Sequence, residues 1–90
     1  MTVPEIHLDR LPEVIAARGT GRSLLYHDIT KGVWPEPVRI GRASCWPRHE
    51  TQELLRARIA GATDDQMREL VRKLHAQRSA LMPALGVEAA

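Results

Sequence analysis

A chain of 90 residues has room for one domain with a single modest core, and not for a catalytic domain beside a binding domain. Hydrophobic residues make up 43% of the chain and charged residues 27%, a balance typical of a folded globular protein. The single cysteine, Cys45, excludes an internal disulfide and fits a reducing compartment. Because the sequence has no run of about 18 apolar residues and no leader pattern, we expect a soluble cytoplasmic protein without a membrane span.

The positive charge is concentrated in the middle of the chain, although the net charge is only +2. Residues 22–48 contain five basic and two acidic side chains, whereas residues 1–21 contain two basic and three acidic ones, and residues 49–90 contain six of each. A basic central segment can bind a polyanion, although solvated surface charge is the commoner role of such residues.

The N-terminal segment predicts an arm followed by a short helix. Residues 1–8 show no periodicity and contain Pro4, so we expect an arm or a short edge strand. Pro12 and Glu13 suit the first turn of a helix of about two turns, and Gly19 suits its end. Its apolar positions recur at helical spacing and are Leu11, Val14 and Ile15.

A second helix is predicted from Arg22 to Lys31, directly after a glycine-containing turn. Leu25 and Ile29 lie on one face of it, and Gly32 follows as a C-terminal stop. Two short helices joined in this way form a helix-turn-helix pattern, which many small helical proteins contain.

A short β-hairpin follows, because the two prolines within residues 33–37 exclude helix there. Val38–Ile40 alternates apolar and polar residues, residues 41–44 are turn-like, and the chain becomes extended again at Cys45. We expect two arginines on the hairpin and two tryptophans covering its hydrophobic base, namely Arg39, Arg42, Trp34 and Trp46.

Pro47 is expected to begin a third helix that ends at Gly61. Its inward-facing residues are predicted to be Leu54, Leu55 and Ile59. Glu50 and Glu53 share a face of this helix, and carboxylates at that spacing are usually solvated.

The final helix is predicted from Asp64 to Met82, and Thr63–Gln66 has the spacing of a capping box at its start. One stripe of this helix contains Met67, Leu70, Val71, Leu74, Arg78, Leu81 and Met82. The stripe either packs within the domain or contacts a partner, and its candidate partner residues are Met67, Leu70, Val71, Leu74 and Leu81. The predicted organisation is therefore an arm (1–8), a domain of three helices and a hairpin (9–61), a C-terminal amphipathic helix (62–83) and a flexible tail (84–90).

Residues 11–61 resemble the AlpA family of phage-type regulators and the related excisionases, with a more distant likeness to MerR-type DNA-binding heads. The segments that carry the resemblance are Leu11-Pro12-Glu13-Val14, Gly21-Arg22-Ser23-Leu24-Leu25-Tyr26, Gly32-Val33-Trp34-Pro35-Glu36-Pro37-Val38-Arg39-Ile40-Gly41-Arg42, and Trp46. The chain departs from the family at Gly21, where Ser is common, and at His27, where Arg is frequent. The resemblance implies a mainly α-helical winged helix-turn-helix with a small β-hairpin wing, here followed by an extra C-terminal helix.

In that fold the second helix enters the major groove of double-stranded DNA, and the wing contacts the minor groove or the backbone. An arginine at the start of the helix can pair with guanine, and a leucine can touch a thymine methyl group. The candidate DNA-binding residues are Arg22, Ser23, Leu24, Tyr26, His27, Lys31, Arg39, Arg42 and Ser44.

We expect no catalytic residues, no metal and no cofactor. Cys45 and His49 form a single pair, which is too few ligands for a zinc site. Neither Ser23 nor Ser44 has a base that the sequence can point to, and there is no phosphate-binding glycine loop.

Three hypotheses remain for the function. The favoured one is an excisionase, or recombination directionality factor, that binds and bends attachment-site DNA in the nucleoid, assembles along it and steers a tyrosine integrase toward excision. The second is an AlpA-type transcription regulator that uses the same DNA surface at a promoter. The third is a protein-protein adaptor that acts through the C-terminal helix. A small domain without a ligand-sensing portion suits the architectural role of the first.

Overall fold

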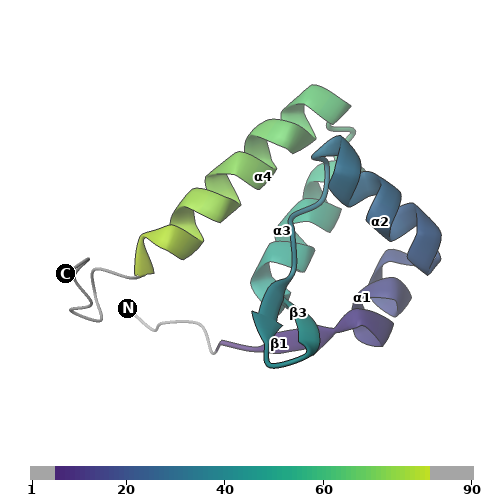
Figure 1. The fold of residues 1–90 in the computed structure, drawn as a ribbon. Coiled ribbons are helices and arrows are strands. Elements are labelled where there is room, and N and C mark those ends of the chain that lie inside the picture. The colour runs from purple at the N-terminus through teal and green to yellow at the C-terminus, as the bar shows by residue number, and fades with distance from the viewer. Residues whose placement is uncertain (1–5, 82–90) are drawn as a thin grey trace.

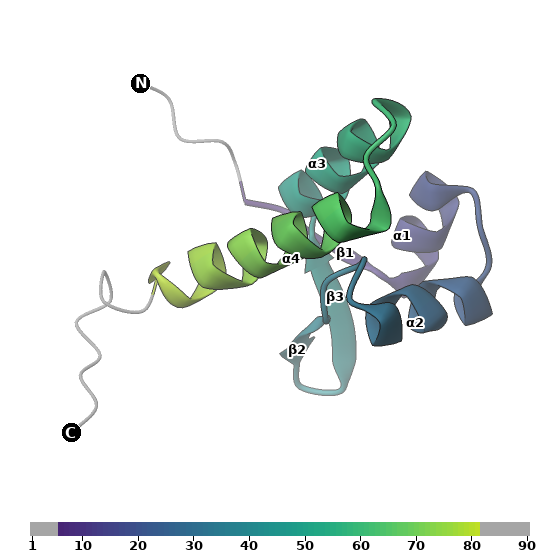
Figure 2. The same ribbon diagram turned by 90° about the horizontal axis from the view of Figure 1, so that it is seen from above.

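The computed structural model describes residues 6–81 and contains four helices and a three-stranded antiparallel sheet. In chain order the elements are β1 (Leu8–Arg10), α1 (Leu11–Arg18), α2 (Arg22–Lys31), β2 (Val38–Ile40), β3 (Ala43–Pro47), α3 (Arg48–Ile59) and α4 (Asp64–Ser79). Helices α1 and α2 lie together on one side of the molecule, whereas the C-terminal end of α4 extends away from them (Figures 1 and 2). The predicted order of helix, helix, hairpin, helix and helix is confirmed.

The sheet has the order β1-β3-β2, so the predicted hairpin forms its centre and one edge. The N-terminal segment contributes the other edge, because Leu8 pairs with Pro47 and Arg10 with Cys45. Of the two alternatives for residues 1–8, Leu8 takes the edge strand, and this strand continues to Arg10. Pro47 ends β3 and immediately precedes α3, one residue later than expected. Residues 1–5 and the predicted tail at 84–90 lie outside the described part of the chain.

Helices α1 and α2 end as the sequence predicts. Gly19 and Gly32 follow α1 and α2 with φ angles of 73° and 81°, in the left-handed region that glycine adopts without strain. The Arg18 guanidinium forms an ion pair with Asp28, which joins the end of α1 to α2. The same guanidinium lies 4.5 Å from the centre of the Trp34 ring, so it also fixes the segment after α2.

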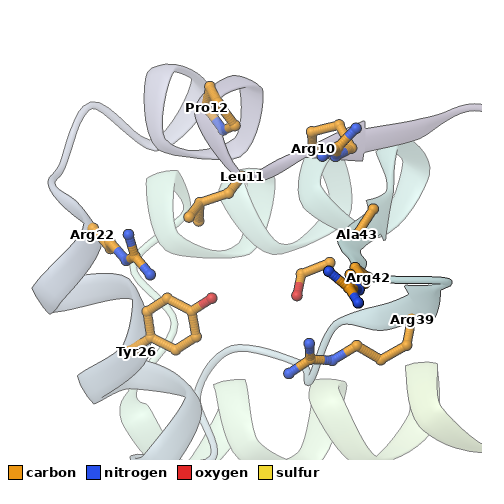
Figure 3. Close-up of a pocket in the computed structure, with 9 residues that line it drawn as sticks. Arg10, Leu11, Pro12, Arg22, Tyr26, Arg39, Arg42 and Ala43 are labelled. Carbon is orange, nitrogen blue, oxygen red and sulfur yellow. The ribbon is translucent and has the colours of Figure 1, made fainter.

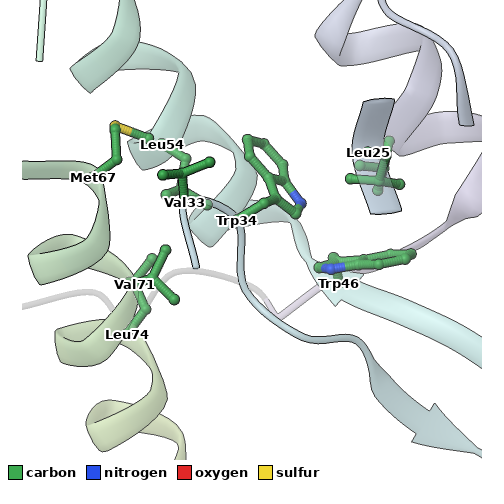
Figure 4. Packing of buried hydrophobic residues seen from close by; sticks show 9 residues of the cluster. Leu25, Val33, Trp34, Trp46, Leu54, Met67, Val71 and Leu74 are labelled. Atoms are coloured by element: carbon green, nitrogen blue, oxygen red, sulfur yellow. The ribbon is translucent and has the colours of Figure 1, made fainter. Parts of the chain in front are cut away.

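Both tryptophans, which the sequence predicts at the hydrophobic base of the hairpin, are buried in the core. Trp34 lies between the residues of α3 and α4 and those of α2 and β3 (Figure 4). Trp46 is fully buried, and its indole Nε1 donates a hydrogen bond to the Pro35 carbonyl at 2.9 Å. The remaining buried members of this cluster are Val14, Leu25, Val33, Leu54, Met67, Val71 and Leu74.

Two expectations for α3 are wrong. Ile59 is 86% exposed, because residues five positions apart lie about 140° apart around a helix and Leu54 already points into the core. Glu50 is 1% exposed, and its carboxylate accepts two hydrogen bonds from Arg78 of α4, at 2.9 and 2.6 Å. The buried carboxylate is therefore held by a charge that the sequence places 28 residues away.

Helix α4 belongs to the domain core. Its predicted capping box is present, since Thr63 Oγ1 accepts from the Gln66 backbone N–H and the Gln66 side chain accepts from that of Thr63. Met67, Val71 and Leu74 are buried and Leu70 is partly buried against the same cluster. Of the two alternatives for the stripe, Met67, Val71 and Leu74 thus take the one within the domain, because the core covers them, whereas Leu70 stays partly exposed. Leu81 is 63% exposed, and Met82 lies outside the described residues.

Helix α4 also holds both ends of the segment that joins α2 to the hairpin. Arg68 Nε donates to the Lys31 carbonyl at 2.9 Å, next to the end of α2. Near the start of β2, Arg78 Nη1 donates to the Glu36 carbonyl at 2.8 Å, and the Glu36 backbone N–H donates to His75 Nε2 at 3.2 Å. These contacts fix the position of the hairpin relative to α2.

The edge strand β1 is fixed by a buried carboxylate. Asp9 accepts hydrogen bonds from Arg48 at 3.0 and 2.7 Å, and His7 Nε2 lies 3.2 Å from its Oδ1. The hydrogen bonds from Arg48 are the main reason that the pKa of Asp9 lies below its ordinary value of 3.8. Because the folded-state pKa is lowered, this contact stabilises the fold above the ordinary pKa and the stabilisation is lost as the pH falls below it.

We therefore expect Asp9→Asn to destabilise the protein at neutral pH but much less in acid. Urea unfolding of wild type and variant, compared at about pH 6 and pH 2.5, measures the gap in the free energy of unfolding. The gap should shrink at the lower pH as Asp9 of the wild type takes up a proton. A gap of equal size at both pH values would show that the charge of Asp9 is not what holds β1.

Candidate nucleic-acid interface

A hollow of about 490 Å³ lies between helices α1 and α2 and the hairpin. It is lined by Arg10, Leu11, Pro12, Arg22, Tyr26, Arg39, Arg42, Ala43 and Ser44. Arg22 and Tyr26 reach it from α2, and the Arg39 side chain extends toward them from β2 (Figure 3). Residues from the strand β1, the helices and the hairpin thus meet at one concave surface.

The hollow collects cations whose charge no described carboxylate neutralises. Of the 13 lysine and arginine residues, seven form ion pairs within residues 6–81: Arg18, Lys31, Arg48, Arg58, Arg68, Arg72 and Arg78. The six without an ion pair in this part of the chain are Arg10, Arg22, Arg39, Arg42, Arg56 and Lys73. Four of these six line the hollow, and none of its lining residues is acidic. Such clustering of unpaired charge makes the surface attractive to an anion.

Tyr26 gives the hollow a polar group that is not a cation. Its side chain is 36% exposed, and its hydroxyl points into the hollow (Figure 3). The Arg22 guanidinium lies 5.8 Å from the centre of the Tyr26 ring, within the range of a cation–π contact. Arg22 is therefore oriented along the rim of the hollow by its neighbour one helical turn away.

The structure brings five of the nine candidate DNA-binding residues together. Arg22, Tyr26, Arg39, Arg42 and Ser44 all line the hollow. Ser23, Leu24 and His27 are exposed on α2 but do not line it, and Leu24 is 46% exposed.

Lys31 is placed differently from the other candidates. Its Nζ lies 3.3 Å from Asp64 Oδ2 at the start of α4, and Arg58 pairs with the same carboxylate. The charge of Lys31 is thus compensated within the protein, which leaves it less available to an anion than the arginines of the hollow.

Sequence reasoning missed Arg10. This residue ends β1 and directly precedes α1, and its backbone N–H donates to the Glu13 carboxylate at 2.7 Å. It lines the hollow only because β1 pairs with the central strand of the sheet. An arginine at the end of a predicted edge strand was the available signal, but the pairing of that strand was not predicted.

The arrangement suits anion binding. Arginine offers planar donors that match the oxygens of a phosphate group.

Within residues 6–81 no group of three or more His, Cys, Asp or Glu side chains gathers as a metal site. Among these residues there is also no helix with the length and apolar character needed to cross a membrane.

In comparisons with protein families, curated proteins and solved structures, no family model, curated sequence or structure matches this chain.

Proposed function

We propose that this protein binds double-stranded DNA sequence-specifically and acts as an excisionase, bending attachment-site DNA to direct a tyrosine integrase toward excision. The observation that carries the proposal is the group of four arginines without a carboxylate partner in the described chain, gathered between α2 and the hairpin. DNA presents a dense array of phosphates, and neutralising them with arginine releases condensed counterions.

Duplex DNA is favoured over other polyanions by the shape next to the hollow. Helix α2 has 10 residues, a length of about 15 Å, and exposes Ser23, Leu24 and His27 beside the arginines. A major groove about 12 Å wide accepts a helix, and these side chain types can contact base edges there. The arginines of the hairpin suit the adjacent minor groove or backbone, where negative potential is concentrated.

The burial of α4 bears on the alternatives. The adaptor hypothesis needs an exposed stripe on this helix, but Met67, Val71 and Leu74 are buried in the core. The transcription-regulator hypothesis uses the same DNA surface as the excisionase hypothesis, so a recombination assay separates the two.

An excision assay tests the proposed role. The purified protein is mixed with an integrase encoded beside it and a plasmid that carries the attachment sites, and the excised product is scored. We expect excision to depend on the protein and to be strongly reduced by Arg42→Ala, because bending a site of about 20 to 30 base pairs costs on the order of 1 to 6 kcal/mol that backbone contacts must offset.

Arg56→Ala is the control, since Arg56 is an exposed arginine without an ion pair in the described chain and does not line the hollow. It should support excision like the wild type. Excision that proceeds equally well without the protein would contradict the excisionase role and favour action at a promoter.

A further inference from the structure

We propose that the hollow holds one backbone phosphate of the DNA strand. Arg10, which lies outside both α2 and the hairpin, completes this phosphate site. The inference rests on the proposed DNA binding and deepens it. It also assigns Arg22 to the backbone, whereas the sequence favoured a guanine contact for this residue.

Side chains from three different elements converge on the hollow. Arg10 comes from β1, Arg22 and Tyr26 from α2, and Arg39 from β2, yet all line the same concave surface. Its volume of about 490 Å³ leaves room for a phosphodiester group.

The residues that line the hollow carry a concentrated positive charge. Four arginines line the hollow, and none of its described lining residues is acidic, so the free protein carries mutual repulsion there that a bound anion would relieve. A phosphodiester supplies one negative charge on two oxygens that accept from forked guanidinium donors. The Tyr26 hydroxyl can donate to the same oxygens, because it points into the hollow (Figure 3).

The position of Arg22 favours a contact with the DNA backbone. Its guanidinium lies 5.8 Å from the Tyr26 ring centre and lines the hollow, so it is directed toward the other arginines. Ser23, Leu24 and His27 are exposed outside the hollow and remain for contacts with bases. Phosphate contacts set the register of the protein on DNA, and base contacts set its sequence preference.

The test measures the affinity of protein variants for duplexes in which one phosphate at a time is replaced by an uncharged group. A duplex is first enriched from a random library by the wild-type protein, and methylphosphonate then replaces each phosphate in turn. At one position within each bound site, we expect wild-type affinity to fall about tenfold or more, the loss expected for a charge-assisted contact. Arg10→Gln should lose affinity on the unmodified duplex, and neutralising that one phosphate should cost it a smaller factor than it costs the wild type, because one partner of the phosphate is already gone.

Three further variants complete the design. Arg39→Gln should likewise become less sensitive than the wild type to neutralisation of the same phosphate, which keeps the test decisive if Arg10→Gln alters the fold. Arg56→Gln, the matched control, should retain the wild-type pattern. Arg22→Gln should weaken binding to the enriched duplex and to a random duplex by the same factor.

The outcomes separate the two proposals. If the loss from Arg10→Gln and the loss from methylphosphonate are independent at every position, so that the two factors simply multiply, the phosphate site is overturned. DNA binding by the protein would remain supported. A larger loss for Arg22→Gln on the enriched duplex than on the random one would return Arg22 to base recognition and overturn its assignment here. Failure of the wild type to enrich any duplex would contradict the proposed function, and the phosphate site with it.

Discussion

Replacing Glu50 by alanine should lower the free energy of unfolding by about 3 to 5 kcal/mol, the loss expected when one partner of a buried ion pair is removed. Glu50 is 1% exposed and holds Arg78 through two hydrogen bonds. Without the carboxylate, a largely buried guanidinium keeps only its bond to the Glu36 carbonyl. A domain of this size has a total stability of about 5 to 15 kcal/mol, so the loss should be a large fraction of the stability.

Glu53→Ala is the matched control, because Glu53 is an exposed glutamate on the same helix and forms no ion pair within residues 6–81. Urea unfolding followed by circular dichroism gives the midpoints of wild type and both variants. We expect a large decrease in the midpoint for Glu50→Ala and little change for Glu53→Ala. Similar decreases for the two variants would show that the Glu50–Arg78 pair does not join α3 to α4.

The sequence predicts the helices of the helix-turn-helix because their local signals agree. Pro12 and Glu13 lie in the first turn of α1, Gly19 and Gly32 end the two helices, and Leu25 faces the core. Each of these features is set within one or two turns of chain, so the pattern of residues is sufficient to place it. The hairpin is predictable for the same reason, from two prolines and a short alternation.

The errors concern the packing of residues that are distant in sequence. Glu50 is expected to be solvated because a carboxylate on an amphipathic helix usually is, and its partner Arg78 comes from a different helix. The stripe of α4 is compatible with a core or with a partner, and only the packing of Met67 and Leu74 against the tryptophan cluster decides between them. The apolar character of Ile59 suggests a core position, whereas its angular position on α3 leaves it exposed.

Some residues of the candidate site can be predicted from local sequence, and others depend on the packing of distant segments. Arg22, Arg39 and Arg42 can be chosen from the charge of the central segment and from the resemblance, and they do line the hollow. Arg10 cannot be chosen in this way, because its place depends on β1 pairing with β3. Lys31 is a candidate on the same grounds, but its ion pair with Asp64 of α4 cannot be read from local sequence.

The second large effect is expected for DNA affinity when the two hairpin arginines are replaced. The double variant Arg39→Gln/Arg42→Gln should bind duplex DNA about a hundredfold more weakly than the wild type, if each arginine makes a charge-assisted hydrogen bond to the DNA. Both side chains are exposed on the hairpin, so their replacement should leave the core intact. The salt dependence should also decrease, by about 0.9 in the slope of log affinity against log salt for each phosphate that is no longer neutralised.

The most direct measurement is fluorescence anisotropy of a labelled duplex of about 20 to 30 base pairs at about 50 and 200 mM salt. It compares the wild type with Arg39→Gln/Arg42→Gln and with Arg56→Gln/Lys73→Gln, which removes the same number of charges from outside the hollow. We predict salt-sensitive binding by the wild type and by the second variant, and a large loss of affinity for the first. Undetectable wild-type binding at the lower salt concentration, or equal losses for the two double variants, would contradict the assignment of this hollow as a DNA-binding surface.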